Sequence, residues 1–166
     1  MRASACGWVA YTLNDALDLG KRSAEITHNH PEGIKGAQAV AVAIHLAHKR
    51  MSKEYIRECI EHEFGYDLQH SCDEIRPSYD WESSCQGTVP PAFMAFFDSH
   101  DFESAIRLAV SLGGDSDTLA CITGGIAQAF YEDIPQFPEW IMSEMRARLP
   151  QAFWDVIRDV EKLVVK

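Results

Sequence analysis

The chain has 166 residues, of which 46% are hydrophobic and 24% are charged, and its formal net charge is −10. This length and apolar content support one domain with its own core, and they exclude both a disordered tail and a pair of ordinary domains. No run of Lys or Arg could neutralise a row of phosphates, which argues against a nucleic-acid-binding protein. The excess of acidic residues instead favours a role for a divalent cation.

Five cysteines, an odd number, are scattered through apolar helical stretches, which is typical of reduced thiols in a cytoplasmic protein. The longest apolar run, residues 37–47, is interrupted by Gln38 and His45 and is too short to span a bilayer. The first residues resemble a signal peptide only weakly, because Asp15 and Asp18 follow at once. We therefore expect a cytoplasmic protein without a membrane-spanning segment.

Helical periodicity dominates the sequence, and strand-like alternation is nearly absent. A first helix is predicted over residues 3–13, and a second follows it, capped by Asn14 or Asp15. Pro31 suits the first turn of a third helix, where a missing N–H costs nothing, and this helix extends to about His48. Because the third helix is apolar almost all round, we expect it at the centre of a bundle.

The fourth predicted helix begins after Ser52 and ends at Gly65. Residues 66–88 are polar, carry Pro77 and Gly87 and have no sustained period, so we expect a long surface segment of the kind that often has a function. The helical pattern then resumes in five predicted helices, over residues 91–97, 102–112, 116–131, 139–149 and 151–165. The predicted fold class is all-α.

The clearest candidate site is the segment 113–118, Gly-Gly-Asp-Ser-Asp-Thr, between two apolar helices. The carboxylates of Asp115 and Asp117 and the hydroxyl of Thr118 are hard oxygen ligands suited to Mg²⁺ or Mn²⁺, and the glycines allow a tight turn. A second interpretation is that Asp115 or Ser116 caps the following helix while Asp117 complements its dipole. The pattern alone favours capping, although two adjacent carboxylates are what a cation would need at the positive end of a helix.

A second candidate is the segment 26–33, which holds His28 and His30 in a polar turn between helices. Histidines two residues apart could bind a metal, a phosphate or a substrate hydroxyl. The simpler interpretation, which the pattern favours, is a solvated turn in which Thr27 or Asn29 caps the next helix.

Histidines and cysteines further along the chain match no strong zinc pattern, and we reject a zinc site there: Cys59, His62, His70, Cys72 and Cys85. The sequence also has no glycine-rich phosphate loop, no G-x-S-x-G elbow and no H-E-x-x-H motif. Segments 26–33 and 113–118 therefore remain the candidates.

These segments resemble the ADP-ribosylglycohydrolase family. The C-terminal signature of that family is matched in order by Val-Pro-Pro-Ala at 89–92, by the segment 113–118 and by Gly-Gly at 124–125. Thr-His at 27–28 and Met-Arg at 1–2, followed by an alanine-rich helix, are also similar to the family. The resemblance covers nearly the whole chain.

The resemblance implies an orthogonal multi-helix bundle with a paired magnesium site that hydrolyses an N- or O-glycosidic bond to the anomeric carbon of ADP-ribose. Carried over to this sequence, Asp115, Asp117 and Thr118 would be metal ligands, and His28 would lie against ADP-ribose. Mg²⁺, or alternatively Mn²⁺, would hold the ribose hydroxyls and orient a water. A carboxylate next to the metal, Asp115 or Asp117, would then act catalytically as the general base.

The sequence departs from the family at its start. Family members begin with a segment bearing a catalytic or metal-binding Glu, an acidic Thr-Asp-Asp-type motif and a glycine-rich phosphate loop, and none of these precedes the Met-Arg at 1–2. We therefore expect residues 1–166 to form a single, partial domain of this family, truncated at the N-terminus.

Two functions stay open at this point. One is a hydrolase that cleaves the bond between ADP-ribose and an acceptor, and the other is a catalytically inactive domain that binds ADP-ribose or is structural, like the crystallin-type members of the family. Because the absent helices would leave the apolar residues 37–47 uncovered, we also expect a homo-oligomer or a complex with a chain that supplies the missing segment.

Overall fold

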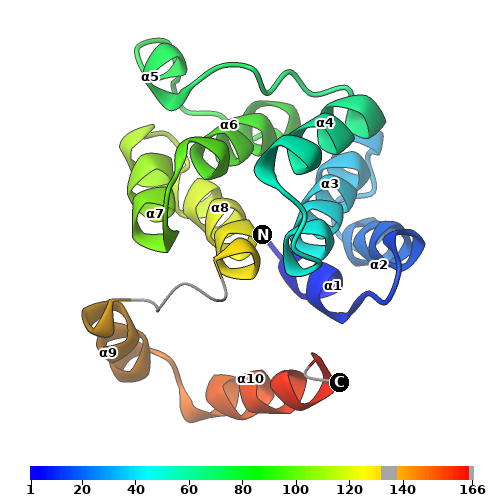
Figure 1. Cartoon of the computed structure of the whole chain (residues 1–166), viewed down its shortest axis with the longest axis vertical. Coiled ribbons are helices and arrows are strands. Elements are labelled where there is room, and N and C mark those ends of the chain that lie inside the picture. The colour runs from blue at the N-terminus through cyan, green and yellow to red at the C-terminus, as the bar shows by residue number, and fades with distance from the viewer. Residues whose placement is uncertain (132–137, 165–166) are drawn as a thin grey trace.

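The computed structural model describes residues 1–131 and 138–164, and every regular element in these ranges is a helix (Figure 1). The all-α fold class is therefore confirmed. The helices in chain order are α1 (Ser4–Val9), α2 (Leu13–Glu25), α3 (Pro31–His48), α4 (Lys53–Phe64), α5 (Cys72–Ile75), α6 (Cys85–Asp98), α7 (Phe102–Ser111), α8 (Ser116–Phe130), α9 (Glu139–Arg148) and α10 (Gln151–Val164).

Helix α3 lies at the centre of the body formed by α1–α8, in contact with α1, α2, α4, α6 and α8 (Figure 1). All residues from Ala39 to Ala47 are less than 5% exposed. The predicted central position of this helix is thus confirmed. Since helices of the same chain already cover residues 39–47, the reason we gave for expecting an oligomer is wrong.

Close contact between the helices of this body depends on small residues. A Cβ added at Gly7 in α1 would lie 2.5 Å from the carbonyl oxygen of Ala41 in α3. A Cβ at Gly125 in α8 would lie 2.5 Å from the hydroxyl of Ser4. Because the Ala41 carbonyl belongs to the backbone, α1 can approach α3 this closely only with glycine at position 7, whereas a Cβ at position 125 would require the Ser4 hydroxyl to move.

Two helix starts differ from the prediction. Helix α1 ends at Val9, and α2 is capped by Thr12, whose hydroxyl accepts a hydrogen bond from the Asp15 N–H while the Asp15 carboxylate accepts one from the Thr12 N–H. This capping box satisfies two amides at once, which explains why Thr12 caps the helix instead of Asn14 or Asp15.

Helix α6 begins at Cys85, so that Pro90 and Pro91 lie inside it and not at its start as predicted. Proline lacks the N–H that bonds to the carbonyl four residues earlier, so a helix normally avoids it beyond the first turn. The Ser84 side chain caps this helix by accepting a hydrogen bond from the Gly87 N–H at 3.2 Å. Burial of residues 91–97 against the body compensates for the missing bonds.

The polar segment before α6 follows the body closely and contains the single turn α5. The Cys72 N–H donates to the Asp98 carboxylate at 2.7 Å, and the Arg76 guanidinium donates to the Ser111 hydroxyl at 3.1 Å. The segment therefore passes over the end of α7 before it enters α6.

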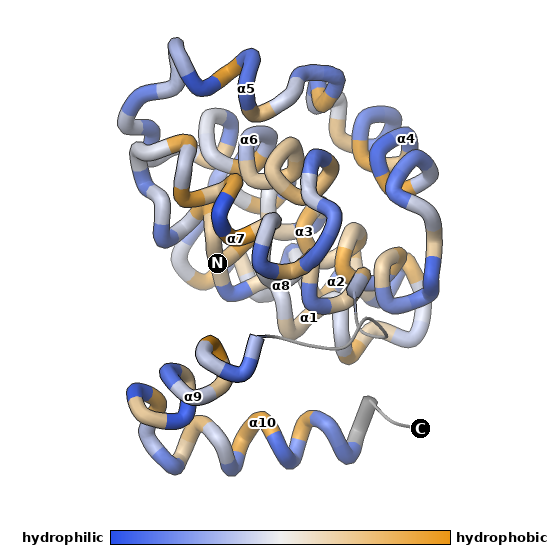
Figure 2. Tube along the Cα trace, turned by 60° about the vertical axis from the view of Figure 1, so that its left-hand side comes forward, coloured by the Kyte–Doolittle hydropathy of each residue, from blue (hydrophilic) through white to orange (hydrophobic). Residues whose placement is uncertain are grey.

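Helices α9 and α10 follow the body, and α10 contacts α1. Figure 2 shows hydrophobic and hydrophilic stretches alternating along α10. Two of its apolar side chains, Phe153 and Val156, are 57% and 60% exposed, and Trp140 of α9 is 57% exposed. None of the helices within residues 1–131 and 138–164 has the length and apolar content needed to cross a membrane.

Candidate functional site

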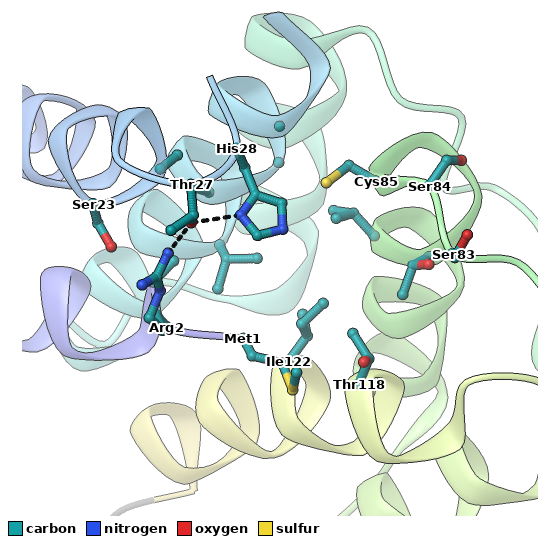
Figure 3. Close-up of a pocket in the computed structure, with 18 of the residues that line it drawn as sticks. Met1, Arg2, Ser23, Thr27, His28, Ser83, Ser84, Cys85, Thr118 and Ile122 are labelled. Atoms are coloured by element: carbon teal, nitrogen blue, oxygen red, sulfur yellow. Dashed lines mark hydrogen bonds between the residues drawn. The ribbon is translucent and has the colours of Figure 1, made fainter. Parts of the chain in front are cut away.

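A pocket of about 540 Å³ opens between the α2–α3 turn, the start of α6 and the start of α8 (Figure 3). Its size is in the range of small-molecule sites. His28, Asp115 and Thr118 all line it, although His28 is 87 positions before Asp115 in the chain. The structure therefore brings three of the four predicted site residues together, while Asp117 stands beside the pocket and does not line it.

The α8 wall of the pocket depends on the turn that links α7 to α8. Gly113 and Gly114 have φ angles of 79° and 57°, a left-handed backbone that glycine adopts without strain. A Cβ on Gly114 would also lie 3.0 Å from the carbonyl oxygen of Asp80, so the segment before α6 packs directly on this turn. Both features place Asp115 at the N-cap position of α8, where it lines the pocket.

Asp115 does not cap α8. It occupies the N-cap position with φ −77° and ψ 65°, but its side chain makes no capping hydrogen bond. The Asp117 carboxylate accepts from the Thr118 N–H at 2.9 Å. The geometry of the Asp115 side chain therefore does not support the capping interpretation, and this carboxylate interacts with Asp117 and Thr118.

The two carboxylates lie close enough to interact. Hydrogen bonding with the Asp117 side chain and with Thr118 lowers the pKa of Asp115 below its ordinary value of 3.8. At neutral pH this carboxylate is ionised, and a pair of ionised carboxylates repel each other unless a cation lies between them. Among residues 1–131 and 138–164, no cluster of three or more Asp, Glu, His or Cys side chains could hold a metal ion.

The opposite wall is built around His28, just after α2. Its Nδ1 lies 2.7 Å from the Thr27 hydroxyl oxygen, which also accepts a hydrogen bond from the Arg2 guanidinium (Figure 3). The first turn of α3 approaches this segment closely, since a Cβ added at Gly33 would lie 2.6 Å from the His28 carbonyl oxygen. His30 does not line the pocket.

His30 has the capping role that we assigned to Thr27 or Asn29. Its Nδ1 accepts a hydrogen bond from the Glu32 N–H at 3.3 Å, at the N-cap position of α3. Of the two histidines in this turn, one thus starts a helix and the other faces the pocket.

The third wall of the pocket was not predicted from the sequence. It comes from the start of α6 and the residues just before it: Ser83, Ser84, Cys85 and Thr88. The Thr88 hydroxyl donates to the Glu82 carbonyl at 3.2 Å, which closes the chain around this helix start. Burial raises the pKa of the Cys85 thiol, which is therefore protonated and weakly nucleophilic at neutral pH. The only sequence signal was a pair of serines, the residue type that often caps a helix.

Arg2 was also missed as a residue of the site. It lines the pocket together with Met1 and reaches the α2–α3 turn through Thr27. In the sequence it stood out only as part of the Met-Arg pair.

Comparison with known proteins identifies the family of the chain. The family model described as ADP-ribosylglycohydrolase matches residues 1–165. The chain is 30% identical to an uncharacterised protein of Archaeoglobus fulgidus over 82% of its own length and 50% of the relative. It is 30% identical to the ADP-ribosylarginine hydrolase Tri1 of Pseudomonas putida, over 83% of this chain and 40% of the relative.

A further relative is the ADP-ribosylhydrolase ARH3 of Gallus gallus, with 25% identity over 86% of this chain and 51% of the relative. The chain thus spans about half the length of the curated relatives it matches. In all three comparisons the match takes in more than four fifths of the present sequence.

Proposed function

Since the chain belongs to the ADP-ribosylglycohydrolase family, we propose that it hydrolyses the glycosidic bond between ADP-ribose and an acceptor with the help of a divalent cation. One observation carries the proposal: His28 lines the same pocket as Asp115 and Thr118, which come from a separate part of the sequence. A hydrolase of this kind needs one group that holds the nucleotide sugar. It needs a second group nearby that assists the attack of water on the anomeric carbon and the departure of the acceptor.

The donor set at the start of α8 fits Mg²⁺ or Mn²⁺. Asp115 and Asp117 supply two carboxylates and Thr118 a hydroxyl, which are hard oxygen donors, and Asp115 is not engaged as a helix cap. When bound, the cation supplies positive charge beside the reacting sugar oxygens.

The residues of the chain then have separate tasks. The Asp115 carboxylate, ionised at neutral pH, accepts a proton from the attacking water or holds a ribose hydroxyl. His28 holds the ADP-ribose from the opposite wall. Asp117 orients the first turn of α8 through its hydrogen bond to the Thr118 N–H and adds negative charge beside Asp115.

A second function, binding of ADP-ribose without turnover, is favoured by the small number of metal ligands. The described residues contain no cluster of three or more Asp, Glu, His or Cys side chains for a metal. Loss of ligands from a metal site removes charge that stabilises the transition state. We therefore expect the 166-residue chain on its own to release ADP-ribose slowly or not at all.

Both functions require that the chain binds ADP-ribose, and calorimetric titration of ADP-ribose in the presence of Mg²⁺ tests this. The wild type should bind, and His28→Ala should bind at least about 10-fold more weakly, as expected for a lost hydrogen bond to a charged group. His62→Ala, which removes a histidine whose side chain is 84% exposed and paired with Glu63, is the control and should bind like the wild type. Absence of ADP-ribose binding by the wild type would contradict both functions.

A release assay on an ADP-ribosylated protein separates the two functions. Release that depends on Mg²⁺ supports the hydrolase, and binding without release supports the second function. Arginine is one acceptor to include in this assay, because the Pseudomonas putida relative is named an ADP-ribosylarginine hydrolase.

The proposal also covers the cellular compartment of the protein and its assembly with other chains. All five cysteines are unpaired, which fits a reducing compartment such as the cytoplasm. The exposed apolar side chains of α9 and α10 fit assembly with a second copy or with a chain that carries the remainder of the family's domain. Sedimentation at micromolar concentration tests this, and a clean monomer would contradict it.

A further inference from the structure

Three side chains on one wall of the pocket form a continuous hydrogen-bonded series. The Arg2 guanidinium donates to the Thr27 hydroxyl oxygen, and that oxygen lies 2.7 Å from Nδ1 of His28 (Figure 3). The series runs from the first residues of the chain to the end of α2 and finishes at a ring that lines the pocket.

The donor and acceptor roles in this series follow from the chemistry of the groups. A guanidinium can only donate, whereas a hydroxyl has a single hydrogen to donate and can accept through its lone pairs. Because Thr27 accepts from Arg2, its own hydrogen remains for Nδ1 of His28, at a length typical of a hydroxyl hydrogen bond. If Nδ1 carried the proton, the exposed Thr27 hydroxyl would accept from two donors and its own hydrogen would be left to solvent.

We propose that Arg2 and Thr27 are positioning residues that hold neutral His28 in the tautomer with its proton on Nε2. In a neutral imidazole one nitrogen donates and the other accepts, so an accepting Nδ1 leaves Nε2–H as the donor. Figure 3 shows the second ring nitrogen of His28 turned away from Thr27 and towards the open space of the pocket.

The consequence is a fixed hydrogen-bond donor in the pocket. It lies opposite the start of α8, where Asp115 and the neighbouring Asp117 form what we call the acidic wall. Such a donor selects a ligand group that accepts, such as a phosphate or sugar oxygen, and disfavours a cationic group at this position. The identification of that ligand as ADP-ribose rests on the proposed function, whereas the tautomer can be measured without any ligand.

Long-range ¹H–¹⁵N correlation on histidine-labelled protein near pH 8, where an ordinary imidazole with a pKa of about 6.5 is neutral, reads the tautomer directly. The wild type and Thr27→Ser should show a protonated Nε2 and a bare Nδ1 on His28. Thr27→Val, which keeps the shape but lacks the hydroxyl, and Arg2→Met should show a larger share of Nδ1–H. His30, whose Nδ1 accepts from a backbone N–H, is the internal reference and should not change.

Titration with ADP-ribose in the presence of Mg²⁺ provides the second measurement. Thr27→Val should bind about 3- to 10-fold more weakly than the wild type, the effect of one hydrogen bond, and Thr27→Ser should restore the affinity. A proton on Nδ1 in the wild type overturns the proposal, as does equal behaviour of Thr27→Val and Thr27→Ser in both measurements. If the wild type does not bind ADP-ribose, the proposed function fails, and the tautomer comparison still decides the roles of Arg2 and Thr27.

Discussion

The two walls of the pocket differ in how their polar side chains are satisfied. On the α2–α3 side, Arg2, Thr27 and His28 are hydrogen-bonded to one another. On the α8 side, Asp115 makes no capping hydrogen bond and stands beside a second carboxylate. The first wall thus holds a cation, a hydroxyl and an imidazole that pair in series, whereas the second wall places two carboxylates side by side.

The largest expected effect is the loss of cation binding when the acidic wall is neutralised. Asp115→Asn combined with Asp117→Asn should weaken Mg²⁺ or Mn²⁺ binding by about 100-fold or more in calorimetry, because both carboxylates of the site lose their charge. Asp155→Asn with Asp159→Asn on α10 removes the same charge from exposed positions and is the matched control. Equal cation binding by the two double variants would show that the acidic wall is not a metal site.

A separate Asp115→Ala variant tests the capping interpretation, because asparagine caps a helix about as well as aspartate and only alanine removes the capping group. Loss of a helix cap costs about 1–2 kcal/mol of stability. Since the Asp115 side chain makes no capping bond, we expect the free energy of unfolding to change by less than about 0.5 kcal/mol, the range for exposed substitutions. A denaturant titration that finds a cost above about 1 kcal/mol would restore the capping role.

The next effect concerns the turn that holds the acidic wall. Gly114→Ala should cost about 1–2 kcal/mol because of its positive φ, with a further cost because the new Cβ would lie 3.0 Å from the Asp80 carbonyl. Gly113→Ala has the same kind of backbone strain but meets no atom within 4 Å. Thermal unfolding should therefore show Gly114→Ala as the less stable variant, and the reverse order would contradict the contact with Asp80.

The smallest effect is the pH dependence of cation binding. The pKa of Asp115 is lowered in the folded chain, so its ionised form is present at neutral pH and is lost only as the pH falls through a value below 3.8. Cation affinity should thus stay nearly constant from pH 7 to about pH 5 in the wild type. A loss of affinity already near pH 6 would indicate a histidine ligand instead.

Local patterns in the sequence were enough for most of the fold. The apolar run in α3 predicted its central position, and Ser52 and Gly65 predicted where α4 begins and ends, because helix periodicity and caps act within a few residues. The two site segments were also identified locally, from residue types suited to a cation and to a polar ligand.

The tertiary structure decided what lies beside those segments. Sequence periodicity could not place Ser84 and Cys85 in one pocket with His28, since this depends on how the helices pack. It could not show that Asp115 is free of a capping bond, because this depends on the left-handed turn at Gly113 and Gly114. Nor could it show that α3 is covered by its own chain.

The sequence alone therefore determined the helices and the chemical character of each site segment, which are set by neighbours along the chain. Only the tertiary structure determined that the His28 turn and the Asp115 turn share one pocket, and that Arg2 reaches Thr27 across 25 positions. The physical reason is that hydrogen bonds and charge pairs act over a few ångströms in space, whatever the separation of their residues in the sequence.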